Sequence, residues 1–236
     1  MERKMLIGMI VLIVSFIVIL FLIFRLNLGG TTDKEICKNS VFLKDKASVF
    51  SGPLNCKTNY LCISGGEDCL GSISETVEVN SESKEAVMKA IADEMSSCWW
   101  QFGEGKLNYG TEADVKDVSI KYALCSVIEF GSDVQEKIPE ITYSEFYEHL
   151  RKTPKDSSQT YLKYLYGTPY PSSLTIQSQF KVYDINQDKI RTNEKYSIIT
   201  GIDDNIDTPD EILKVYIIPT SETSARLDQG EFITKA

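Results

Sequence analysis

The chain has 236 residues, 42% of them apolar, and a formal net charge of −9 at neutral pH. This apolar content predicts a folded protein, because disordered chains are poorer in apolar residues. All of the net negative charge lies after residue 26, so the folded part repels phosphate groups and a nucleic-acid partner is not expected.

The first element in chain order is an apolar segment, residues 5–24, without a charged side chain. As a helix rising 1.5 Å per residue it spans about 30 Å, the thickness of a hydrocarbon core. It is longer than the apolar part of a cleaved signal peptide, and no small-x-small site follows it. The segment therefore predicts an uncleaved signal anchor in contact with membrane lipid, with residues 1–4 in the cytoplasm because Arg3 and Lys4 precede it.

Six cysteines follow the anchor, and their even number predicts up to three disulfides in a domain outside the cytoplasm. Residues 25–36 are expected to be a polar tether. From Cys37 to residue 73 the sequence is interrupted by glycine and proline, which predicts small strands and turns, with short apolar stretches at 40–43 and 60–63.

A helix is predicted from Ser81 or Ser83 to Phe102, because apolar residues recur at three- and four-residue spacing until Gly103. A strand is predicted over 118–130. Its alternating residues Tyr122, Leu124 and Ile128 are expected to share one face, with Cys125 on the other.

The sequence Thr142-x-x-Glu145 is a capping box that predicts a second helix, and a third is expected over 158–166, ending at Gly167. Three strands are predicted after a break at 168–173. They lie at 176–184, 196–202 and 212–218, as an antiparallel meander continuous with strand 118–130, followed by a polar tail at 219–236. The expected fold is one α+β domain, with a cysteine-bearing region at 37–170, a meander at 171–218, an antiparallel sheet and about three helices.

The cysteines allow fifteen disulfide pairings, and the elements favour one of them without excluding the others. Cys98 on the helix and Cys125 on the strand would join these two elements. Cys62 and Cys69 would close a loop containing Gly65-Gly66, which leaves Cys37 for Cys56. A metal site is the alternative, but no Cys-x-x-Cys occurs and the single histidine, His149, is distant in sequence.

The most distinctive segment is Cys98–Lys106, which contains two adjacent tryptophans and Gly103-Glu104-Gly105. It is not a phosphate-binding loop, because the first glycine and the final hydroxyl of that motif are absent. Adjacent tryptophans on a helix cannot both face one core, so Trp100 is expected to be partly exposed. Four positions are candidate partner-binding residues, with a purely structural role as the alternative. They are Trp100, Glu104, Tyr166 and Tyr170.

Four segments form a recognisable pattern: Cys37 with Cys56-Lys57-Thr58, the run 91–95, the Cys-Trp-Trp-Gln-Phe-Gly-Glu-Gly-Lys segment at 98–106, and Cys125. Together they resemble a group of uncharacterised single-pass, membrane-anchored proteins of archaea with small genomes, over residues 37–170. The resemblance implies a shared fold and an archaeal envelope location. It implies no activity, since none is known for the group. Cys62 and Cys69 are extra to the pattern, which favours their pairing with each other.

Two acidic turns suggest calcium binding as an alternative. Residues 184–188 and 203–207 each begin like an EF-hand loop, but both lack the glycine at the sixth position and the glutamate at the twelfth. Ordinary Asx-rich turns explain them equally well, so no cofactor is expected.

No catalytic motif occurs, and an enzymatic function is not expected. The expected function is therefore that of a membrane-anchored extracytoplasmic protein that binds a partner or supports the envelope, with other envelope proteins as candidate partners. Two alternatives stay open: a subunit of a filament or membrane complex assembled through residues 5–24, and a membrane-tethered enzyme.

Overall fold

The computed structural model describes residues 13–16, 32–47, 53–109, 120–169, 188–203, 212–226 and 231–232. Its main element is a mixed sheet with strand order β2-β1-β3-β6-β7, in which β8 also pairs with β3. The strands are β1 (Asn59–Ser64), β2 (Glu75–Glu78), β3 (Ile120–Phe130), β6 (Tyr196–Asp203), β7 (Ile212–Pro219) and β8 (Glu231–Phe232).

The sheet is not antiparallel throughout, which corrects the sequence prediction. β3, β6 and β7 run antiparallel, as expected for a meander. However, β1 is parallel to both β2 and β3. The long connection from β2 to β3 contains helix α3 (Lys84–Gln101), and a helical crossover of this kind is what parallel strands need.

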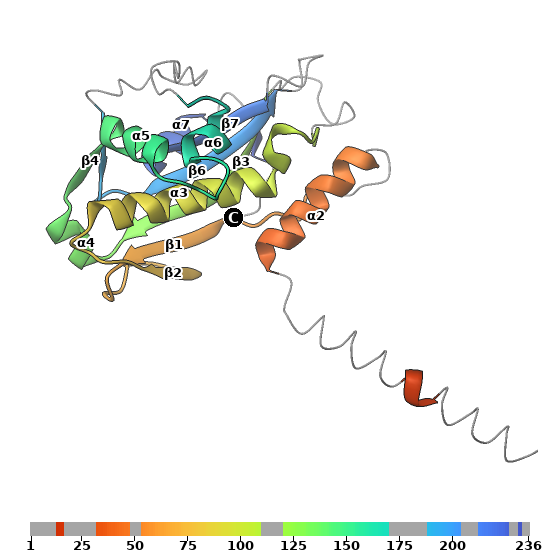
Figure 1. Cartoon of the computed structure of the whole chain (residues 1–236), viewed down its shortest axis with the longest axis horizontal. Coiled ribbons are helices and arrows are strands. Elements are labelled where there is room, and N and C mark those ends of the chain that lie inside the picture. Colours follow the sequence, from red (N-terminus) through yellow and green to blue (C-terminus); the bar gives the residue numbers. More distant parts are fainter. Residues whose placement is uncertain are drawn as a thin grey trace, which may run out of the picture.

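Three helices pack together beside the sheet: α3, α5 (Tyr143–Lys152) and α6 (Tyr161–Tyr166) (Figure 1). These are the three helices that the sequence predicts. Ser83 caps α3 and the capping box of Thr142 and Glu145 opens α5, while Gly167 ends α6 in the left-handed conformation. The predicted apolar stripe of α3 is buried. Its members are Val87, Ile91, Met95, Cys98, Trp99 and Phe102.

A β-bulge in β3 changes which residues face the core. Leu124 pairs with Ile199 but Ser126 pairs with Ile198, so Cys125 is an extra residue in β3. The apolar core contains Ala123 and the bulge residue Cys125, followed by Ile128 and Phe130 after the bulge. The prediction that Cys125 faces away from Ile128 is therefore wrong, because it assumed an unbroken alternation.

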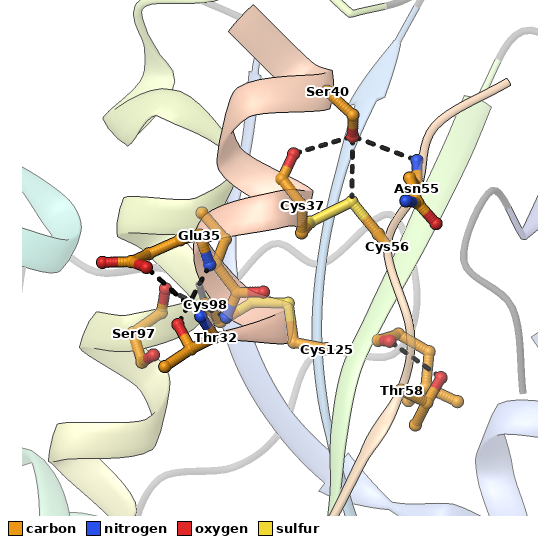
Figure 2. The surroundings of a disulfide bond; sticks show 12 residues. Thr32, Glu35, Cys37, Ser40, Asn55, Cys56, Thr58, Ser97, Cys98 and Cys125 are labelled. Carbon is orange, nitrogen blue, oxygen red and sulfur yellow. Dashed lines mark hydrogen bonds between the residues drawn. A yellow bond between two sulfur atoms is a disulfide. The ribbon is translucent and has the colours of Figure 1, made fainter. Parts of the chain in front are cut away.

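Helix α2 (Asp33–Lys46) replaces the end of the predicted tether and the small strand expected at 40–43. Thr32 and Glu35 form a capping box at its start. Figure 2 shows how it is fixed: Cys37 is bonded to Cys56, and the Ser40 hydroxyl donates to the Cys37 carbonyl (2.8 Å) and accepts from the Asn55 amide (3.0 Å).

An ion pair between α2 and α3 lies close to the core. Lys34 Nζ is 2.7 Å from Glu94 Oε2 and 3.4 Å from Glu75 Oε2. The Glu94 side chain is only 6% exposed, and its second oxygen has no partner among the described residues. Burial alone would lower the pKa of Lys34, but the two carboxylates outweigh it and raise that pKa. α2 is therefore part of the folded domain and not a flexible connection.

Several smaller elements were not predicted: α4 (Ser132–Lys137), the β4–β5 pair (Glu140–Thr142 with Lys189–Arg191) and α7 (Thr220–Arg226). With β8, α7 occupies part of the segment that was expected to be a polar tail. The expected strand at 176–184 lies outside the described residues. Because β6 and β7 belong to the same sheet as β1 and β3, the cysteine-bearing region and the meander form one α+β domain.

Residues 13–16 form a turn of helix, and the rest of the predicted anchor lies outside the described residues. Within the described ranges, no helix has both the length and the apolar character needed to cross a membrane.

Candidate functional site

The C-terminal end of α3 has an unusual backbone. Gly103, Glu104 and Gly105 all have positive φ angles (78°, 58° and 73°), and Glu104 is the one described residue other than glycine with such an angle. Gly105 also lies against the Trp99 ring, because a Cβ there would come within 2.9 Å of that ring. The two glycines therefore allow the chain to turn tightly over Trp99, and Glu104 is held between them.

Two side chains hold the Glu104 carboxylate by hydrogen bonds, and a third acts on its pKa through its charge. Lys106 donates to one oxygen (2.7 Å) and the Tyr164 hydroxyl to the other (2.9 Å). The hydrogen bond from Lys106 lowers the pKa of Glu104 most, and Tyr164 and the charge of Lys38 lower it further, against the opposing effect of partial burial. Glu104 is therefore a carboxylate at neutral pH. Partial burial and Glu104 in turn raise the pKa of Tyr164, which keeps its proton.

Lysines lie over the aromatic rings around this carboxylate. Lys38 Nζ of α2 is 3.7 Å from the Trp100 ring centroid, and Lys155 Nζ is 4.2 Å from that of Tyr164. Ammonium groups in such positions are attracted to the ring face by about 0.5–1 kcal/mol at exposed sites. We call the set the aromatic–lysine surface. Its members are Lys38, Trp100, Glu104, Lys106, Lys155 and Tyr164.

Each member of the aromatic–lysine surface is half-buried or exposed. In an otherwise acidic chain this surface places Lys38 and Lys106 near the Glu104 carboxylate, and Lys155 pairs with Asp156 (3.9 Å). Lys38 forms no ion pair with the described residues. Half-exposed aromatic rings beside cationic groups are typical of protein binding surfaces, because they supply apolar area and directional charge together. The arrangement can bind a partner, but it places no nucleophile beside a base.

The structure brings together two of the four predicted partner-binding residues, Trp100 and Glu104. Tyr166 is buried: its hydroxyl donates to the Val215 carbonyl of β7 (2.8 Å), so the expectation that it is a surface residue is wrong. Tyr170 lies outside the described residues. Tyr164 was not among the predicted residues, although helical spacing places it opposite the buried Leu162 and Tyr166.

The cysteines are joined as Cys37–Cys56, Cys62–Cys69 and Cys98–Cys125. These are the pairs that the sequence favoured, and no cysteine is free. Cys98–Cys125 fastens α3 to the bulge of β3, two turns before the left-handed segment at Glu104. Cys37–Cys56 and Cys98–Cys125 thus brace α2 and α3, which present Lys38 and Trp100, and no cysteine is a reactive thiol.

A second polar group surrounds His149 on α5. Its ring nitrogens lie 3.4 Å from the Thr153 hydroxyl. Partial burial lowers the pKa of His149, and the carboxylate of Glu85 opposes that effect. Nearby, Asp93 accepts hydrogen bonds from Tyr161 and Lys89. These contacts connect α3, α5 and α6 and have an evident structural role.

The two turns considered for calcium lie mostly outside the described residues. Within the part of the chain that the structure describes, no three histidine, cysteine or acidic side chains come together as metal ligands.

Comparisons of this chain with protein-family models, with curated proteins and with solved structures find no match. The aromatic–lysine surface is therefore interpreted from its own geometry and charge.

Proposed function

We propose that the chain is a single-pass membrane protein, anchored by residues 5–24, whose disulfide-braced domain lies outside the cytoplasm and binds a partner through the aromatic–lysine surface. Three disulfides support the location, because a reducing cytoplasm does not maintain them. The resemblance to membrane-anchored archaeal envelope proteins agrees with this proposal, and the segment that carries the resemblance also supplies Trp100 and Glu104.

The observation that carries the binding function is the position of Lys38 over Trp100. The two residues come from different helices, and the contact fixes a cation and a large ring together on the surface. Trp100 is half-exposed although Trp99 beside it is buried, so it adds contact area outside the core. Aromatic and cationic side chains held in this way are enriched among the residues that contribute most to binding.

The location is tested by the intact mass of protein from native membranes, alkylated before and after reduction. We expect all six cysteines to be alkylated only after reduction. Alkylation of all six without reduction, in denatured protein, would place the domain in a reducing compartment and refute the proposed location.

The binding function is tested by cross-linking the tagged full chain in its native membrane and quantifying the covalent complexes. Trp100→Ala and Lys38→Glu are expected to abolish complexes that the wild type forms. Lys57→Glu is the matched control, since Lys57 is an exposed lysine whose ammonium group pairs with Asp33 and not with a member of this surface. The same complexes at the same yield from wild type and all three variants would contradict binding through the aromatic–lysine surface.

A further inference from the structure

Two adjacent apolar side chains on α2 are exposed to solvent. Phe42 is 49% and Leu43 58% exposed, whereas the other face of this helix is buried through Cys37 and Val41. Ile36 is half-buried and lies two turns before Leu43, on the same side of the helix. A single exposed leucine is ordinary in a soluble domain, whereas an apolar pair on one helical turn next to a predicted membrane anchor is a candidate contact surface.

The charges beside this pair suit a lipid surface. α2 carries Lys44 and Lys46 in its last turn, and Lys46 Nζ lies 5.8 Å from the Phe42 ring centroid. Asp45 is engaged by Lys46 and by the Asn108 amide, and Lys44 has no ion-pair partner among the described residues. Apolar rings flanked by lysines are the composition of helices that lie in the headgroup region of a bilayer, where the ammonium groups meet phosphates.

The chain length keeps α2 near the membrane. Residues 25–32 join the predicted span to α2, and a fully extended chain covers at most about 3.5 Å per residue, hence about 28 Å in all. The exposed pair is therefore held at a high effective concentration beside the bilayer. The acidic charge of the domain as a whole opposes such contact, but the last turn of α2 is locally basic.

We propose that Phe42 and Leu43 insert into the headgroup region of the membrane that holds residues 5–24, so that α2 is an interfacial helix. This inference rests on the anchor in the proposed function and not on the aromatic–lysine surface. Because Cys37–Cys56 and the Lys34–Glu94 pair fix α2 to the domain, contact of α2 with lipid sets the orientation of the whole domain. The molecule that contacts the exposed pair is lipid, and the competing candidate is a second copy of the chain.

The test places a photoreactive amino acid, p-benzoylphenylalanine, at position 42 of the full chain in nanodiscs of phosphatidylcholine with some phosphatidylglycerol. The matched control has the same amino acid in place of Leu70, which is 89% exposed beside the Cys62–Cys69 loop. We expect lipid adducts, identified by mass, at position 42 and none at position 70. Cross-links to a second copy, no adducts at 42, or equal adducts at both positions would each overturn the inference.

A second variant tests whether lipid contacts near position 42 depend on the side chains of Phe42 and Leu43. With the photoreactive amino acid at Asn39, an exposed position one turn before Leu43, lipid adducts are expected in the wild-type background. They are expected to be lost in Phe42→Ser/Leu43→Ser, whose intact disulfides are checked by mass. Adducts that persist in that variant would also overturn the inference. Alkaline carbonate extraction of the same chain tests the anchor separately: release from the membrane refutes the anchor, whereas retention without adducts refutes only the interfacial role of α2.

Discussion

Removing the disulfide between Cys98 and Cys125 should destabilise the domain more than removing that between Cys62 and Cys69. The two bonds close loops with sequence separations of 27 and 7 residues. By constraining the unfolded chain, loops of these lengths contribute about 3.5 and about 2.4 kcal/mol respectively to the free energy of unfolding. Both sulfurs of the longer loop are buried, whereas Cys69 is half-buried, so the alanine variants leave two small cavities in one case and one in the other.

Each buried sulfur that is removed adds about 1 kcal/mol to the loss of unfolding free energy, by analogy with deletion of a buried methyl group. The double alanine variant at 98 and 125 should therefore be less stable than that at 62 and 69 by about 2 kcal/mol, which corresponds to about 4–8 °C in Tm for a domain of this size. Differential scanning calorimetry of the full chain in detergent measures both. Equal Tm values, or a lower Tm for Cys62→Ala/Cys69→Ala, would show that loop length and burial do not set the stability here.

Three further predictions concern Lys34, the backbone at Glu104, and the hydrogen bond from Tyr164. Lys34→Met should lower the free energy of unfolding by about 2–4 kcal/mol because it strands the buried Glu94 carboxylate, and Lys34→Met/Glu94→Leu should recover most of that loss in guanidinium unfolding curves. Glu104→Gly should be more stable than Glu104→Ala by about 1 kcal/mol in the same assay, because only glycine avoids the cost of a φ of 58°; equal stability would contradict this. Tyr164→Phe should raise the pKa of Glu104 in an NMR titration. The pKa of Glu104 is lower in the folded state than its ordinary value of 4.5, so the stabilisation by this carboxylate is complete above pH 4.5 and is lost as the pH falls through the folded-state pKa. Because Tyr164→Phe weakens this stabilisation, that variant should lose less stability than the wild type on acidification.

The elements predicted correctly from sequence are those whose signals are local. α3 has a continuous apolar stripe and α5 a capping box, and both form where the sequence places them. A capping box also begins α2, at Thr32 and Glu35, but residues 25–36 were expected to be a polar tether, and the glycine and proline breaks after Cys37 suggested a small strand at 40–43. In that case the local signal is present in the sequence, and the helix forms where the capping box begins it.

Other features depend on contacts that no local pattern encodes. The parallel pairing of β1 with β3 follows from α3 packing across the sheet between them, which brings distant segments together. The bulge at Cys125 adds one residue to β3 and so reverses the alternation on which the predicted faces rested. For the candidate site, the sequence indicated Trp100 and Glu104, but their partners Lys38 and Tyr164 lie on other helices and become neighbours only in the folded chain.

These distant contacts also connect the two proposed surfaces. Lys38 lies over Trp100, and the exposed Phe42 follows Lys38 by one helical turn on the same side of α2, so the exposed pair and the aromatic–lysine surface are neighbours. The disulfide fixes α2 to the domain, so the two surfaces keep this relative position. If α2 lies on the bilayer, the aromatic–lysine surface is held at a constant height and direction above it. The partner would then be a molecule that reaches this surface from beside the membrane, such as another envelope protein, and not one that requires the domain to turn away from the lipid.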